Sequence, residues 1–164
     1  MGNATNGAKA GIIAGIIYGI FLGVTTYFEV ISQKSVMLTA ITKSMPANSP
    51  FTPEQLYNIV VLVTPVVVTV GGLIGGLIVG AIYGSVNSRI PGRTAVMKGI
   101  VVGLVLWLII GVLAGLRSLE YGVLYYLAGV GTGLVGALIF GALLGYFFGR
   151  FSRPPKMDPA MQGL

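Results

Sequence analysis

The chain has 164 residues, of which 55% are hydrophobic and 9% are charged, and its formal net charge at pH 7 is +6. Because a soluble domain carries about 25% charged residues, this composition excludes a protein whose whole surface faces water and indicates an integral membrane protein. The sequence has no cysteine and no histidine, which excludes disulfides, thiolate metal sites and histidine-based acid–base chemistry.

Four charge-free apolar runs predict four transmembrane helices, since a helix needs about 20 apolar residues to cross the hydrocarbon core. We therefore expect an all-α integral membrane protein, a four-helix bundle formed by a single membrane domain over residues 1–164. Lys9 precedes the first run as in a signal peptide, but the run is longer than a signal peptide's apolar region and no clean cleavage site follows it. The four runs are residues 10–28, 55–88, 99–116 and 121–149.

The segment between the first two runs, residues 32–52, is long and only partly polar. Leu38, Ile41 and Met45 recur within it at spacings typical of one helix face. This pattern predicts a short helix on the outer membrane surface.

The second run has a well-marked start and an internal proline. Thr52, Pro53 and Gln55 match a capping box with proline at the first helical position. Pro65 lies inside the run and predicts a kink, because its ring removes one backbone hydrogen bond. Thr69, one turn later, is expected either to satisfy freed backbone groups or to line a polar path.

The connection over residues 88–93 is a short basic turn, in which Pro91 and Gly92 suit a type II geometry. The C-terminal tail, residues 150–164, is polar and contains proline.

Basic residues predict that both termini are cytoplasmic, because positive charge concentrates on the inner side of a membrane protein. They flank the apolar runs rather than gather in a patch, so the charge does not indicate nucleic-acid binding. Seven lie inside in this orientation, namely Lys9, Arg89, Arg93, Lys98, Arg150, Arg153 and Lys156, and three lie outside, namely Lys34, Lys43 and Arg117.

Glycine recurs at four-residue intervals in all four runs, which is the strongest pattern in the sequence. In lipid, small residues at this spacing let helix backbones approach closely, so we expect glycine-zipper packing with crossings near −40°. The frequency of glycine in membrane helices does not by itself account for one phase in all four runs. The glycines expected to pack against other helices are Gly11, Gly15, Gly19, Gly23, Gly72, Gly76, Gly80, Gly84, Gly99, Gly103, Gly111, Gly133, Gly141 and Gly145.

The runs also match in pairs, which predicts two tandem helical hairpins. Residues 72–84 align with residues 133–145 at an offset of 61, and the first run aligns with the third at an offset of 88. Repeat one would cover residues 7–92, with the outer loop at 32–52, and repeat two residues 95–153. Such repeats share one membrane orientation and are related by an axis along the membrane normal.

Length, four spans, tandem hairpins and glycine ridges together resemble the duplicated proteolipid subunit of rotary ATPases. That family carries an ionisable carboxylate in the middle of a span, usually the fourth. Residues 121–149 and 55–88 contain none, so the resemblance covers architecture only.

Two oppositely charged residues at the outer ends of the first and third runs suggest an ion pair. The offset of 88 places Glu29 opposite Arg117, and the two have opposite sign. We expect an interhelix ion pair between them, with Glu120 as a competing partner for Arg117. The alternatives are separate solvation of each charge at the head groups, or a cation- or proton-binding role for Glu29.

Four arginines and one tryptophan can be interpreted either structurally or functionally. The arginines at the ends of the second and fourth runs, Arg89, Arg93, Arg150 and Arg153, are expected to contact lipid head groups. Trp107 lies in mid-span, where it fills a groove between helices or, less favoured, contacts a cofactor.

No phosphate-binding loop, catalytic carboxylate pair, nucleophile–base pair or metal-ligand cluster is present in the sequence, so we expect no enzyme activity, no cofactor and no metal. We expect a structural or accessory subunit, or an assembly factor, of a larger membrane complex in the cytoplasmic membrane of a prokaryote. Its expected partners are membrane lipids and other integral membrane subunits, or further copies of the chain. The alternative is a small passive channel or transporter acting as a homo-oligomer, which the internal repeat favours.

Overall fold

A computed structural model describes residues 3–153, without the side chains of Ala114, Glu120 and Tyr121. Within this range all regular secondary structure is helical, and no strand forms. The elements are α1 (Asn3–Ser32), α2 (Lys34–Ser44), α3 (Pro53–Val86), α4 (Ala95–Leu106), the π-helix η1 (Trp107–Leu113), the 3-10 helix η2 (Ala114–Tyr121) and α5 (Val123–Phe151). Four helical stretches are long and apolar enough to cross a membrane: Asn3–Ser32, Pro53–Val86, Ala95–Leu113 and Val123–Phe151.

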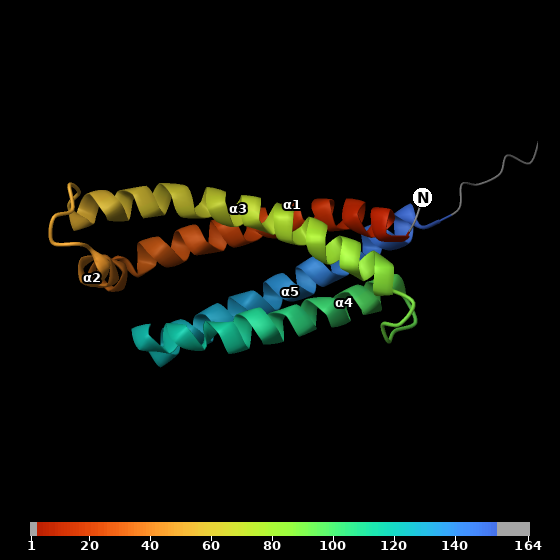
Figure 1. The fold of residues 1–164 in the computed structure, drawn as a ribbon. Helices are drawn as coiled ribbons and strands as arrows, with labels where there is room; N and C mark the ends of the chain where they lie inside the picture. The colour runs from red at the N-terminus through yellow and green to blue at the C-terminus, as the bar shows by residue number, and fades with distance from the viewer. Residues whose placement is uncertain (1–2, 154–164) are drawn as a thin grey trace, which may run out of the picture.

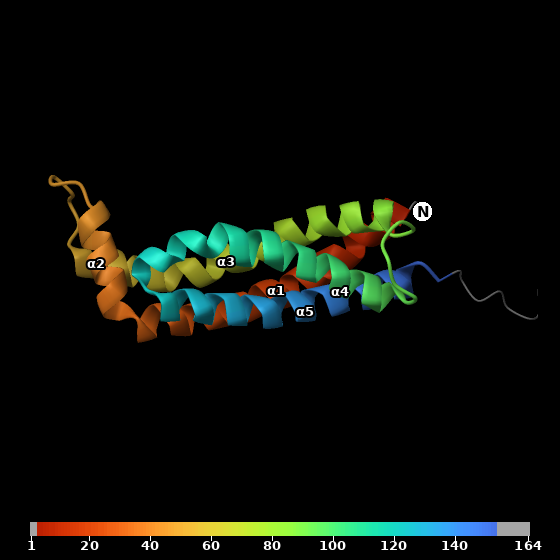
Figure 2. The same ribbon diagram turned by 90° about the horizontal axis from the view of Figure 1, so that it is seen from below.

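The helices pack in the order α3, α1, α5, α4, with the main contacts between α1 and α3, between α4 and α5, and between α1 and α5. The start of α1, the 87–94 turn and the end of α5 lie at one end of the molecule, which we call the turn end (Figure 1). α2 and η2 lie at the opposite end, called the α2 end (Figures 1 and 2). The α1–α3 pair and the α4–α5 pair converge at the turn end and separate toward the α2 end (Figure 1).

The buried core lies in the turn half of the molecule. Tyr83 of α3 is 1% exposed, stacks edge-on against Phe148 of α5 at 5.0 Å, and donates a 2.7 Å hydrogen bond to the carbonyl of Ala95 in α4. One tyrosine thus ties three helices together, which explains why the two helix pairs converge at this end. The buried members of the core are Ala10, Ala14, Tyr83, Phe140, Leu144 and Phe148.

The start of α3 has the predicted capping box. The backbone N–H of Gln55 donates to Thr52 Oγ1 at 3.2 Å, and the backbone N–H of Thr52 donates to Gln55 Oε1 at 2.9 Å. These two bonds satisfy backbone donors that an uncapped helix would expose. Pro65 is accommodated inside α3, which continues without interruption to Val86.

Residues 34–44 form the short helix predicted in the first long connection. None of its residues is buried, and the Lys34 ammonium lies 5.3 Å from the centre of the Tyr57 ring. In the 87–94 turn, Gly92 has φ +144°, a conformation that favours glycine.

The third span differs from the prediction of one regular helix over residues 99–116. Regular α-helix ends at Leu106, and the chain continues as a π-helix and then as a 3-10 helix. The change begins at Trp107, whose backbone N–H is shared between the carbonyls of Gly103 and Leu104. The π-helix thus starts at the position where the sequence pattern predicts a glycine and the chain has tryptophan.

Candidate functional site

Glycines bring α1 and α3 into backbone contact. A Cβ added at Gly11 would meet the carbonyl oxygen of Gly76, and a Cβ added at Gly76 would meet the carbonyl oxygen of Gly11. Because both positions face a backbone atom, any larger residue would push the helices apart. The same reciprocal contact joins Gly7 with Gly80 and Gly15 with Gly72, while Gly19 faces Thr69, Gly23 faces Thr69 and Pro65, and Gly84 faces Asn3 and Gly7.

A second contact of this kind joins α4 and α5. A Cβ at Gly99 would meet the carbonyl oxygen of Gly141, and one at Gly141 would lie 2.9 Å from the Cα of Ile100. Gly103 faces the carbonyl of Ala137, and Gly145 faces the carbonyl of Ala95.

The two helix pairs differ in register by one turn. The sequence offsets make Gly11 equivalent to Gly99, and Gly76 equivalent to Ala137. Gly11 faces Gly76, but Gly99 faces Gly141, four residues further along α5. The second pair has therefore slid by one turn relative to the first.

Trp107 accounts for the two ridge glycines that do not face another helix's backbone. A Cβ at Gly111 would lie 2.8 Å from the indole Cδ1, and a Cβ at Gly133 would lie 3.4 Å from it. The indole Nε1 donates to the carbonyl of Val130 on α5 at 2.9 Å. Gly111 and Gly133 thus differ from the expected backbone contact, because they make room for the indole that fills the space between η1 and α5.

The first helix pair has a contact at the equivalent place. Thr69 Oγ1 of α3 lies 3.1 Å from the carbonyl oxygen of Gly19 and 2.8 Å from that of Pro65. The two sequence offsets place Trp107 at the position of Gly19 and Val130 at the position of Thr69. A side chain-to-backbone hydrogen bond therefore joins these positions in both pairs, with the donor on α3 in the first pair and on η1 in the second, where the long indole reaches across the one-turn displacement.

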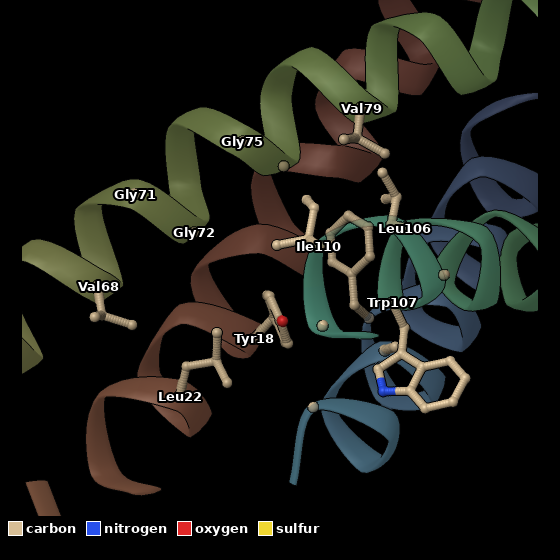
Figure 3. A pocket seen from close by; sticks show the side chains of 16 residues that line it. Tyr18, Leu22, Val68, Gly71, Gly72, Gly75, Val79, Leu106, Trp107 and Ile110 are labelled. Carbon is tan, nitrogen blue, oxygen red and sulfur yellow. The ribbon is translucent and has the colours of Figure 1, made fainter. Parts of the chain in front are cut away.

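A cavity of about 360 Å³ lies between α3 and η1, where the two helix pairs begin to separate (Figure 3). Its walls are apolar side chains and glycines from all four spans, with Trp107 on one side and Tyr18 on another (Figure 3). It is lined by Tyr18, Leu22, Val68, Gly71, Gly72, Gly75, Gly76, Val79, Gly103, Leu106, Trp107, Ile110, Gly111, Gly133, Ala137 and Phe140.

Glu29 contacts α5 rather than Arg117. Thr132 Oγ1 lies 3.4 Å from Glu29 Oε1, and within residues 3–153 no ion pair joins Glu29 to Arg117. The structure differs from the predicted pair because α1 packs against α3 and α5, whereas Arg117 lies on η2, which packs against α5 and η1. The side chain of Glu120, the predicted competitor, lies outside the described part.

The arginines gather at the turn end on two elements. Arg89 and Arg93 belong to the 87–94 turn, and Arg150 and Arg153 line a groove of about 510 Å³ beside the start of α4. All four are exposed. Among the described residues, no group of three or more acidic side chains is placed to hold a metal ion.

Two residues of interest were missed in the sequence. Tyr18 and Thr132 both lie inside predicted spans, and a polar side chain within a span is itself a signal of an interhelix or ligand contact. The spacing patterns do not reveal them, because each belongs to a contact between the two helix pairs.

A family model described as a family of unknown function, DUF6789, matches residues 1–158. No curated protein matches the chain. No solved structure matches it either.

The backbone contact between α4 and α5 predicts that two substitutions on α5 differ in their effect on stability. Gly141→Leu should lower stability by at least about 1–3 kcal/mol, because a branched side chain cannot occupy the space beside Ile100. Gly131→Leu is the control, since a Cβ there meets no atom within 4 Å. Thermal unfolding in detergent measures both; equal stability of the two variants would contradict the contact.

The position of Glu29 predicts which double-mutant cycle shows coupling. Glu29→Met and Thr132→Val should couple by about 0.5 kcal/mol, the low end for a hydrogen bond, because the Thr132 hydroxyl also lies 3.0 Å from the Ala128 carbonyl of its own helix. Glu29→Met and Arg117→Met should be additive. Coupling in the second cycle and additivity in the first would restore the ion pair.

Proposed function

We propose that this chain, which belongs to the DUF6789 family of unknown function, is a non-catalytic accessory subunit or assembly factor of a larger membrane protein complex. The observation that carries the proposal is the one-sided support of α3. Pro65 and Thr69 pack against Gly23 and Gly19 of α1, while Leu62, Val66 and Val70 on an adjacent face are 75%, 61% and 51% exposed. A helix of another subunit laid against this face would bury it as α1 buries its neighbour.

We also propose that the glycine contacts are the zippers of two tandem hairpin repeats. Support comes from two hydrogen bonds, Thr69 to Gly19 in the first pair and Trp107 to Val130 in the second. They join positions related by the two sequence offsets, with the donor and acceptor helices exchanged. A repeated scaffold of this kind holds itself together and leaves its outer faces available to other subunits.

The proposed orientation places the turn end in the cytoplasm and the α2 end outside, in the cytoplasmic membrane of a prokaryote. The four arginines, Arg89, Arg93, Arg150 and Arg153, support it, because all lie at the turn end and would meet anionic head groups of the inner leaflet.

Engineered cysteines test this orientation in a chain that contains none. Ser44 and Ser88 are both exposed and lie at opposite ends. A membrane-impermeant thiol reagent on intact cells should label Ser44→Cys, and should label Ser88→Cys only after permeabilisation. Labelling of Ser88→Cys alone would reverse the orientation.

Photo-crosslinking in cells tests the subunit role. A photoreactive residue at Val66 should crosslink to another polypeptide, and the same polypeptide should co-purify in fixed stoichiometry in mild detergent. Val79, which packs against the core on the same helix, is the matched control and should give no such product. If Val66 yields only monomer and lipid adducts, the exposed face is a lipid face and the proposal fails.

A passive channel or transporter formed by several copies is the second candidate, and the cavity between the helix pairs supports it. In that case Val66 should crosslink to a second copy of the chain, and the purified protein alone should give reproducible flux in liposomes.

A further inference from the structure

The cavity between α3 and η1 combines a large apolar space with glycines that the helix packing does not need. Gly72 and Gly76 face α1, where a Cβ would collide with backbone. Gly71 and Gly75 line the cavity, and a Cβ at either would meet no atom within 4 Å. Glycine is less favourable than alanine inside a helix, and no contact within the described residues requires it at these two positions.

Tyr18 supplies a polar group at the same place. Its ring lies over Gly136, whose added Cβ would be 2.7 Å from the Tyr18 Cε2 atom, and tilts against Phe140 at 5.4 Å. The side chain reaches from α1 into the space that Ile110 enters from η1 (Figure 3).

None of the side-chain hydrogen bonds found among residues 3–153 involves the Tyr18 hydroxyl, whose oxygen is accessible at the cavity rather than enclosed by the chain. By contrast, Tyr57, Tyr83 and Tyr126 each donate to a backbone carbonyl on another element. A hydroxyl without a partner is costly in an apolar environment, so an acceptor brought by a ligand would stabilise it. The other polar group of the wall, the Trp107 N–H, already donates to Val130.

The volume of the cavity, about 360 Å³, indicates what size of ligand it can hold. An apolar cavity of about 150 Å³ already holds benzene, so this one accommodates a ring together with part of a chain.

We propose that this cavity binds a membrane-dissolved molecule with an apolar body and a hydrogen-bond-accepting carbonyl, the chemistry of a quinone, with the carbonyl at Tyr18 Oη and the body against Gly71 and Gly75. The acyl chains of membrane lipids do not match it, because they bring no acceptor to the middle of a span. The inference is independent of the subunit role, since a single chain forms the whole site.

Binding can be followed by the fluorescence of Trp107, because it is the single tryptophan of the sequence and lines the cavity. A benzoquinone carrying a ten-carbon chain, titrated into the purified full chain in detergent, should quench Trp107 fluorescence with saturation. Gly75→Leu should weaken binding at least tenfold, because its side chain fills the cavity without striking backbone. Gly131→Leu, open at its Cβ but away from the cavity, should bind as the wild type does.

Tyr18→Phe isolates the carbonyl contact and should weaken quinone binding about fivefold, the usual size of one hydrogen bond. Dodecane, which has no acceptor, should compete with the quinone equally in both proteins. Thermal unfolding gives a second readout, since the quinone should raise the Tm of the wild type and not that of Gly75→Leu.

Non-saturating quenching of equal extent in wild type and Gly75→Leu would show mere partitioning into detergent and overturn the site. Unchanged quinone affinity in Tyr18→Phe would overturn the carbonyl contact. If Gly75→Leu fails to fold, Gly71→Leu fills the same space from one turn away and decides the question.

Discussion

Reciprocal backbone contact between glycines is the interaction on which the rest of this structure depends. In lipid no hydrophobic force drives helices together, so association relies on close approach. At Gly11 and Gly76, each glycine presents the side that would carry a Cβ to the carbonyl oxygen of the other. A Cα hydrogen occupies that direction, and contacts between such hydrogens and carbonyls contribute about 0.5–1 kcal/mol each. Repetition along α1 and α3 makes one rigid helix pair.

The cavity lies beside the place at which the two helix pairs differ. In the first pair, Gly19 lets α1 and α3 remain close as far as Thr69. In the second, the equivalent residue is Trp107, and an indole cannot lie where a backbone contact is required. The chain accommodates it through the π-helix η1 and through Gly111 and Gly133, which leave room for the ring. The cavity lies beside η1, and the residue that interrupts the glycine pattern is part of its wall.

Local sequence patterns predicted the parts of this fold that depend on neighbouring residues. The capping box at Thr52 and Gln55 requires only the chain itself, and it forms as the pattern indicates. The partner of Glu29 could not be predicted in this way. The repeat offset gives the depth of Glu29 in the molecule but not which helix faces it, and that depends on α1 packing against α5 rather than α4. The cavity could not be predicted from the sequence either, because the glycine periodicity does not show that the α-helix gives way to a π-helix at Trp107.

The two glycine faces of α3 differ in what they contact. Gly72 and Gly76 are fixed by α1, and their occupation by any larger residue would disrupt the first helix pair. Gly71 and Gly75 are one residue away along the chain and about 100° around the helix, so the same spacing rule describes both faces. The second face touches nothing in the described chain, yet it carries the same conformational cost as the first. Gly131 of α5 is also open but lies away from the cavity, so what distinguishes Gly71 and Gly75 is that the space beside them belongs to the cavity wall.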